Sequence, residues 1–255
     1  MNKLIFASDI DNTIMFSYKH RMECDICIEI LDGKEQGFCT PNTFALLEQI
    51  SKKALFIPIT TRSMEQYKRI GFPKSCMPQY ALTTNGAILL VNGAVDTQWY
   101  AESRQIADTW KTALSYIENQ LPNMQEIKRF RMVDDMYLFA ACDNAEEAEK
   151  SKLYFDGKTD LDVVVSGRKI YFFPPMLDKG TAIDRLRKKF LPSHIISAGD
   201  SSIDIPMFDM ADVSIFIKEY AVKNKKVICY HGNIIRDYTK FVLEQVLQEI
   251  DENIK

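Results

Sequence analysis

The sequence predicts an α/β protein with a core built on a doubly wound parallel sheet and a second, α+β domain inserted into it. Three observations indicate this. Short apolar runs alternate with amphipathic helical segments in the first third of the chain, the same alternation returns in the last third, and hairpin signals dominate between them. Alternating strands and helices form parallel sheets covered on both faces, so the outer segments belong together and the middle segment is an insertion.

The outer segments supply the elements of the predicted core. The first strand is the apolar run at 3–9, and a helix follows over 40–53, because Thr40 is a good N-cap and Pro41 suits the first helical turn. The other predicted core strands are at 54–60, 80–86, 194–200, 213–217 and 226–230, and the other helices at 63–72, 180–190, 203–212 and 235–250.

Residues 87–178 do not follow this alternation. Asn92-Gly93 lies between two apolar runs, which is a strong hairpin signal, and the apolar periodicity predicts a helix over 103–120. The remaining predicted elements are a strand at 126–142, a helix at 145–155, and two strands within 161–175 joined at Ser166-Gly167. This combination predicts an inserted domain with a mixed sheet and helices.

The bulk properties of the chain bear on its class of function. Its 255 residues, of which 46% are hydrophobic and 26% charged, suit a folded protein with a sizeable core. A formal net charge of −3 disfavours nucleic acid as a partner. No apolar run approaches the about eighteen residues that a membrane span needs, and the N-terminus lacks a secretory pattern, so we expect a cytoplasmic protein without a membrane partner. Six scattered cysteines favour reduced thiols.

Acidic and hydroxyl side chains follow three of the predicted core strands at the point where each strand ends. Asp9 and Asp11 lie two residues apart after the first strand, so their side chains project to the same side. Thr60 and Thr61 end the strand that should lie beside it, and Asp200 ends a third apolar strand. Open parallel sheets bind ligands at the carboxyl ends of their strands, so we expect these groups to share one site.

Two more charged residues fit the same site. Lys179 stands just ahead of a predicted helix, and Asp204 follows Asp200 by four residues. Neighbouring carboxylates repel each other unless a cation or a proton neutralises one of them, which points to a metal ion and a proton-transfer role. Taken singly, each residue also fits a turn, a helix cap or a solvated surface charge. Their occurrence together in this order favours the shared site.

The ordered motifs resemble those of a known family. DIDNT at 9–13, PITTR at 58–62, Lys179 and GDSSID at 199–204 look like the four motifs of the haloacid dehalogenase superfamily, whose members mostly hydrolyse phosphate esters with magnesium. The insert, entered through TTNGA, is similar to the larger cap class of that superfamily, found in Cof-type sugar phosphatases and sucrose-phosphatase-like proteins. The resemblance implies a Rossmann-like catalytic core at 1–86 and 179–255 and a cap domain at 87–178.

The resemblance also implies a reaction, the hydrolysis of a small-molecule phosphate monoester, sugar phosphate-like, through an aspartyl-phosphate intermediate. Asp9 would be the nucleophile. Asp11 would protonate the leaving oxygen and later take a proton from the hydrolytic water. Lys179 and the hydroxyls of Thr60 and Thr61 would hold the phosphoryl oxygens.

A magnesium ion is the implied cofactor, because a phosphate dianion repels an anionic nucleophile and Mg²⁺ prefers carboxylate and phosphate oxygens. Its implied ligands are Asp9, the main-chain carbonyl of Asp11, and Asp200, with Asp204 orienting them from behind. Two further residues are candidate substrate contacts, Arg62 and Asn85.

The chain departs from the family pattern at two places. Ile203 precedes Asp204 where capped phosphatases often have asparagine, and an apolar side chain cannot bond phosphate. Residues 14–40 are longer than in many relatives and predict a hairpin around Asp32-Gly33, which would stand beside the catalytic edge as a flap. This segment also holds the residues of a weaker zinc hypothesis, His20, Cys24, Cys27 and Cys39.

Two alternatives to a phosphatase remain open at this point. The same site in a mutase or phosphotransferase would pass the phosphoryl group to another hydroxyl. A signalling receiver also phosphorylates an aspartate in a doubly wound fold, although it has no use for a cap. The identity of the substrate and the oligomeric state do not follow from the sequence.

Overall fold

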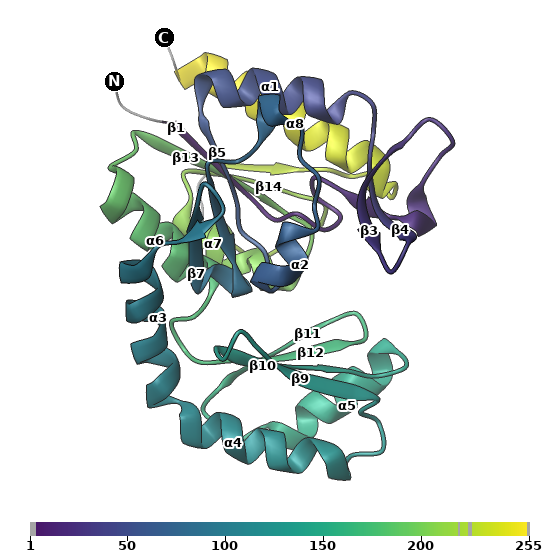
Figure 1. Cartoon of the computed structure of the whole chain (residues 1–255), viewed down its shortest axis with the longest axis vertical. Helices are drawn as coiled ribbons and strands as arrows, with labels where there is room; N and C mark the ends of the chain where they lie inside the picture. The colour runs from purple at the N-terminus through teal and green to yellow at the C-terminus, as the bar shows by residue number, and fades with distance from the viewer. Residues whose placement is uncertain (1–3, 219, 224–225, 254–255) are drawn as a thin grey trace.

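A five-stranded parallel sheet forms the centre of the molecule (Figure 1). The computed structural model describes residues 4–218, 220–223 and 226–253, so Lys3 of the predicted first strand lies outside the described residues. The strand order is β15-β14-β13-β1-β5. The strands are β1 (Leu4–Ser8), β5 (Leu55–Pro58), β13 (His194–Gly199), β14 (Val213–Phe216) and β15 (Lys226–Cys229). This arrangement confirms the predicted doubly wound core, except that the strand predicted at 80–86 meets this sheet only through a bridge between Ile59 and Leu82 and otherwise belongs to a separate small sheet.

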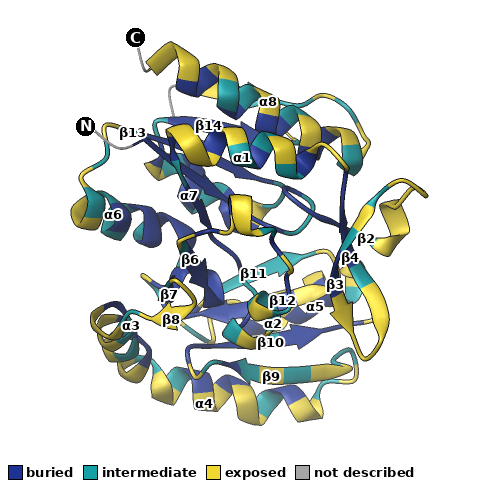
Figure 2. Ribbon diagram, turned by 45° about the horizontal axis from the view of Figure 1, so that its top comes forward, coloured by how far each residue is buried: buried dark blue, intermediate teal, exposed yellow. Residues whose placement is uncertain are grey.

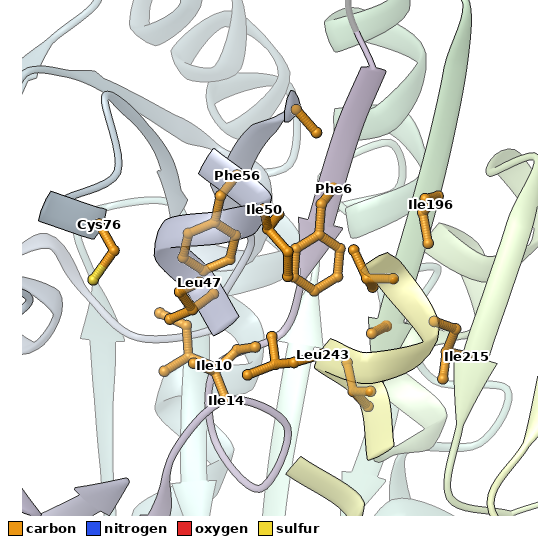
Figure 3. Packing of buried hydrophobic residues seen from close by; sticks show 14 of the residues in the cluster. Phe6, Ile10, Ile14, Leu47, Ile50, Phe56, Cys76, Ile196, Ile215 and Leu243 are labelled. Carbon is orange, nitrogen blue, oxygen red and sulfur yellow. The ribbon is translucent and has the colours of Figure 1, made fainter. Parts of the chain in front are cut away.

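Helices cover both faces of this sheet. Successive side chains along a strand point to opposite faces, and the buried strands carry apolar side chains on both. On β1, Phe6 belongs to the cluster under α1 (Thr43–Lys53) and α8 (Ile235–Asn253). Ile5 belongs to the opposite cluster, under α6 (Lys179–Phe190) and α7 (Ile205–Met210). Figure 3 shows the first of these clusters, in which Phe6 stacks on Phe56 with ring centroids 5.4 Å apart.

Helix α1 begins later than predicted. The sequence indicates a start at Thr40 and Pro41, whereas the first helical residue is Thr43 and Asn42 is the N-cap. The Thr40 carbonyl accepts the Thr43 N–H at 3.0 Å, and the two hydroxyls are also 3.0 Å apart. Thr40 therefore closes a turn ahead of the helix instead of capping it. The predicted helix after the second motif is short, α2 (Met64–Lys68), and has a capping box between Ser63 and Gln66.

The segment between β1 and α1 forms the predicted hairpin. Its strands are β2 (Phe16–Ser17), β3 (Ile26–Leu31) and β4 (Lys34–Cys39), in the order β2-β4-β3. Asp32 and Gly33 both have positive φ, at 51° and 72°, as a tight hairpin turn requires. The Gly71 N–H donates to the Ile28 carbonyl at 2.7 Å, so the hairpin is bonded to the core. Figure 2 shows that its outer part is exposed.

A small antiparallel sheet leads out of the core. It consists of β6 (Tyr80–Thr83), β7 (Ile88–Val91) and β8 (Ala94–Val95), and β7 and β8 meet at the predicted Asn92-Gly93 turn. The β6–β7 pair spans the predicted domain boundary at residue 86, and Trp99 of α3 (Thr97–Thr109) packs in the same cluster as Ala182 of α6. The boundaries themselves stay a prediction.

A four-stranded antiparallel sheet, the cap sheet, makes up the outer part of the insert (Figure 1). Its order is β11-β12-β10-β9, and two helices, α4 and α5, pack on one face. The elements are β9 (Arg129–Val133), β10 (Tyr137–Ala141), β11 (Asp162–Ser166), β12 (Lys169–Phe173), α4 (Lys111–Gln120) and α5 (Ala145–Phe155). Among the helices of the described residues, none combines the length and apolar character that crossing a membrane requires.

Two predicted elements of the insert are each divided in the structure. The helix expected over 103–120 breaks at Trp110, between α3 and α4. The strand expected over 126–142 is a hairpin, because Asp134 and Asp135 turn the chain with φ of 45° and 57°. Aspartate adopts this left-handed conformation more readily than most residues, so the Asp-Asp pair within the apolar run could have indicated the turn.

Candidate active site

The carboxyl ends of three neighbouring strands bring the predicted acidic and hydroxyl residues to one edge of the sheet. Asp9 follows β1, and its N–H donates to the Ala198 carbonyl of β13 at 2.8 Å. On the other side of β1, the Ile59 N–H donates to the Ser8 carbonyl at 2.7 Å, so Thr60 follows β5 beside the same strand end. Asp200 comes directly after β13. Parallel pairing therefore places all three residues at this edge, as predicted.

Lys179 is the centre of a buried ion-pair cluster. Its side chain is 1% exposed, and Nζ lies 2.6 Å from Oδ1 of Asp9 and 2.6 Å from Oδ1 of Asp204. The residue opens α6, where Asp178 caps the helix by accepting the N–H groups of Gly180 and Thr181. Burial lowers the pKa of Lys179, but the two carboxylates outweigh this and raise it, so the ammonium group stays charged.

Three carboxylates lie close together around this lysine. Asp9, Asp200 and Asp204 each present an oxygen within 4.8 Å of the others. Burial, opposed by Lys179 and reinforced by the neighbouring carboxylates, raises the pKa of Asp9 well above its usual value. Burial and the charge of Asp204 raise the pKa of Asp200 to about 7. Full ionisation of the cluster would therefore place more negative charge there than Lys179 compensates, which is the situation that a bound cation relieves.

The donor set of this cluster fits a hard cation such as Mg²⁺. Asp204 is turned toward the protein, because it accepts hydrogen bonds from Lys179, from the N–H groups of Asp200 and Ser201, and from the Ser201 hydroxyl. By contrast, Oδ2 of Asp9 and Oδ1 of Asp200 accept no hydrogen bond from the described residues. Two carboxylates with open oxygens match the one or two that Mg²⁺ usually takes from a protein.

Asp11 is not part of this cluster, and its carboxylate pairs with Arg62. Arg62 donates from Nε to Oδ2 and from Nη2 to Oδ1 of Asp11, both at 2.8 Å. It also donates from Nη1 and Nη2 to the two oxygens of Glu29, at 2.8 and 2.9 Å. Burial raises the pKa of Asp11, but the Arg62 charge and hydrogen bonds outweigh burial and lower it. In this conformation Asp11 is an anion.

Glu29 and Asn12 are site residues that the sequence analysis did not identify. Glu29 comes from β3, its side chain is 5% exposed, and it lies opposite Gly37 of β4, where an added Cβ would come within 3.2 Å of the Glu29 Cβ. Asn12 has a φ of 59°, as expected for a turn, and its Nδ2 donates to Oδ2 of Asp200 at 3.1 Å. The sequence feature that could have identified Glu29 is a single acidic residue between two isoleucines in a predicted strand.

The other predicted site residues fall in different surroundings. Thr60 is buried, and its hydroxyl accepts the Arg62 N–H at 3.1 Å, while Thr61 lines the cavity described below. Asn85 does not lie among the lining residues of that cavity. It donates from Nδ2 to the Leu177 carbonyl at 3.1 Å, and so joins the two chain segments that enter and leave the insert. Its role as a substrate contact stays a prediction.

A cavity of about 670 Å³ opens beside Asp11. Its walls come from the catalytic edge of the core, the β3–β4 hairpin and the cap sheet, and they include Asp11, Arg62, Glu29 and Tyr171. The volume lies within the range typical of small-molecule sites. The predicted flap thus contributes residues to this cavity.

Hydrogen bonds connect the cap sheet to the core beside the cavity, which Thr61 and Tyr137 line. The Tyr137 hydroxyl donates to the Thr61 carbonyl at 2.6 Å. Asp134, in the β9–β10 turn, accepts the Met64 N–H at 3.0 Å and the Thr84 hydroxyl at 2.5 Å. These bonds attach the insert to the segment that follows the second motif.

The residues of the zinc hypothesis contact different parts of the chain. The Cys39 thiol is buried and donates to the Ile14 carbonyl, whereas Cys24 is exposed next to Asp25 and Arg236. Within the described residues, the only group of three or more such side chains close enough to share an ion is the aspartate cluster.

Comparison with known proteins identifies the family. The model of the haloacid dehalogenase-like hydrolases matches residues 78–226. The phosphoglycolate phosphatase of Nitrosopumilus maritimus (strain SCM1) is 30% identical over 109 residues, which are 41% of this chain and 45% of that protein, so the match spans less than half of that relative.

Two solved structures show the same fold over nearly the whole chain. The sucrose-phosphatase from Synechocystis sp. PCC6803, in complex with sucrose and phosphate, has a TM-score of 0.65 and 16% identity, and covers 98% of this chain and 99% of its own. A haloacid dehalogenase-like hydrolase from B. subtilis has a TM-score of 0.61 and 13% identity, with coverage of 95% and 98%. These findings confirm the resemblance on which the sequence analysis relied, and the chain belongs to the haloacid dehalogenase-like hydrolases.

Proposed function

We propose that this protein is a magnesium-dependent phosphatase that hydrolyses a small-molecule phosphate monoester through an aspartyl-phosphate intermediate. The observation that carries the proposal is the buried cluster in which Lys179 bridges Asp9 and Asp204 beside Asp200. Asp9, Asp200 and the main-chain carbonyl of Asp11 would hold the ion. When bound, Mg²⁺ supplies positive charge that lets an anionic nucleophile approach a phosphate dianion.

Asp9 attacks phosphorus in this mechanism. Lys179 binds Oδ1 of Asp9 and so fixes the orientation of the attacking carboxylate. Once the phosphoryl group is transferred, the ammonium group of Lys179 and the hydroxyl of Thr60 bind the phosphoryl oxygens and offset their charge. The hydroxyl of Thr61, in the cavity wall, has the same role.

Asp11 handles the protons. It donates a proton to the leaving oxygen in the first half-reaction and takes one from the attacking water in the second. The anionic, Arg62-bound state of Asp11 suits the second step. The first step requires a protonated carboxyl group, and therefore a looser pair with Arg62 than the one described here.

The names of similar proteins support a small phosphate ester as the substrate. They include a sucrose-phosphatase, a trehalose-6-phosphate phosphatase related protein and a phosphoglycolate phosphatase. A sugar phosphate-like compound suits the volume of the cavity.

The test is a screen of phosphate esters with and without Mg²⁺, in which released phosphate is measured with water as the sole acceptor. We expect release by the wild type and none by Asp9→Asn. Asp251→Asn, on the exposed side of α8, serves as the control and should retain full activity. A wild type inert toward every ester, or an active Asp9→Asn, contradicts the proposal. Phosphate transfer seen only after an alcohol acceptor is added indicates a phosphotransferase.

A further inference from the structure

The cap sheet has two chemically different faces. Residues two apart on a strand share a face, and directly paired residues on neighbouring strands do so as well. Leu138 and Ala140 of β10 pack with α4 and α5 in an apolar cluster. Tyr137 and Phe139 of the same strand face the other way and line the cavity. The cavity therefore lies mainly against this second face of the sheet, and Figure 1 shows the sheet between the core and helices α4 and α5.

The register of the strands arranges this face in rows. In one row, Phe139 pairs with Arg131 on one side and with Tyr171 on the other. In the next row, two residues further along β10, Ala141 pairs with Arg129 and Lys169. The methyl group of Ala141 leaves space between two long cationic side chains, so this last row forms a basic pair with a gap between its members.

Positive charge exceeds negative charge around the cavity. Five cationic side chains line it, Arg62, Arg69, Arg129, Arg131 and Lys169, against two carboxylates, Asp11 and Glu29. The excess stands in a protein whose formal net charge is −3. A hollow lined by one sign of charge concentrates ligands of the opposite sign.

The two carboxylates of the cavity are already bound. Arg62 holds both of them, and Arg69 donates from Nε to Glu29 at 3.3 Å. Arg131 donates to the amide oxygen of Gln66, and its guanidinium lies over the Phe139 ring at 6.0 Å. Arg129 and Lys169 form no ion pair within the described residues. The charge of Lys169 contributes to lowering the pKa of Asp11, but without a direct hydrogen bond, so both cationic groups can still bind a ligand.

The backbone of the basic row lies apart from the place where the cap sheet contacts the core. Tyr137 marks the place where β10 touches the core, through its bond to the Thr61 carbonyl. Ala141 is four residues further along, which corresponds to roughly 13 Å of extended strand. Even with long side chains reaching back, Arg129 and Lys169 are suited to a group several bonds away from the phosphoryl group at Asp9.

We propose that the substrate carries a second anionic group, a carboxylate or a further phosphate, several bonds from the scissile phosphate, and that Arg129 and Lys169 bind it. The proposal deepens the phosphatase function above and rests on it. An oxyanion between two cations forms charge-assisted hydrogen bonds, and Arg129 presents the fork geometry that carboxylate and phosphate match. Neutral sugar phosphates would leave both cations without a partner.

Two matched pairs of esters test this inference. The first is 6-phosphogluconate against sorbitol 6-phosphate, which differ in a carboxylate at the far end, and the second is fructose 1,6-bisphosphate against fructose 6-phosphate. We expect kcat/KM of the wild type to be about tenfold or more higher for the charged member of at least one pair. A preference in the first pair indicates that the second anionic group is a carboxylate, and a preference in the second pair indicates a phosphate.

Variants assign the preference to the basic row. In Arg129→Gln/Lys169→Gln, kcat/KM for the preferred charged ester should fall about tenfold, while that for its neutral partner changes less than about twofold. Both positions are exposed, so the variant should fold. Lys111→Gln removes an exposed cation from α4, on the opposite side of the cap sheet, and should alter neither value.

Several outcomes would overturn the inference. Equal hydrolysis of charged and neutral esters by the wild type would refute the anionic subsite and leave the phosphatase function intact. An equal loss of kcat/KM on both esters in the double variant would have the same meaning. If all four esters are inert, calorimetric binding to Asp9→Asn decides instead. Tighter binding of the charged member then supports the anionic subsite, and equal binding rejects it, while the ester screen described above decides the phosphatase function.

Discussion

Replacing Glu29 by glutamine removes the charge through which the β3–β4 hairpin holds Arg62. The Glu29 side chain is 5% exposed and that of Arg62 14%, so this is a buried pair. Breaking such a pair costs about 3–5 kcal/mol. Glutamine still offers one acceptor oxygen, and Arg62 retains Asp11 as a partner. We therefore expect the free energy of unfolding to fall by the low end of that range, about 3 kcal/mol.

Urea denaturation of the wild type, Glu29→Gln and Glu35→Gln measures this difference. Glu35 is a matched control because it lies in the same hairpin and pairs with Arg21, but at an exposed position where both side chains are about half exposed. Exposed pairs contribute little, so Glu35→Gln should change the unfolding free energy by less than about 1 kcal/mol. Equal losses in the two variants would refute the reasoning that burial makes the Glu29–Arg62 pair important.

Three further predictions follow from the site and the core. Lys179→Met leaves Asp9 and Asp204 without their shared cation, and should lower the unfolding free energy by about 3–5 kcal/mol and abolish phosphate release; a stability equal to that of the wild type would contradict it. Phe6→Ala removes a ring stacked on Phe56 and should cost about 3–5 kcal/mol in urea denaturation. Chelation by EDTA should stop phosphate release and added Mg²⁺ restore it, whereas full activity after chelation would exclude the ion.

The core of the site could be predicted because it depends on local features. The alternation of apolar residues identifies a strand, and a polar residue directly after the strand lies at its carboxyl end. Asp9 and Asp200 needed only this reasoning and the pairing of their strands. Lys179 needed its place at the start of a helix and the order of the four motifs. The structure places all three within one cluster.

Contacts between distant segments could not be predicted in this way. Arg62 pairs with Asp11 and Glu29, which are 51 and 33 positions away, and the sequence did not indicate either partner. Its role as a substrate contact stays a prediction. Asn85 had the same expected role, but its amide bonds the Leu177 carbonyl, 92 positions away. The partner of a charged or amide group depends on which segments pack around it, and local periodicity does not contain that information.

The cap sheet shows the same limit for secondary structure. The apolar run at 126–142 predicts a single strand, whereas the turn at Asp134 and Asp135 makes it a hairpin. That turn lies against the core, where Asp134 accepts two hydrogen bonds. The partners on the core offset the cost of a conformation that isolated residues seldom adopt.

By itself, the sequence determined the doubly wound core, the insertion, the strand-end acids and the lysine, because apolar periodicity and position relative to a strand end are local properties of the chain. Only the tertiary structure decided which carboxylate each cation binds, that the hairpin supplies Glu29 to the site, and that the basic row of the cap sheet faces the cavity. The energy of a charge depends on its burial and its neighbours, and packing between distant segments sets both.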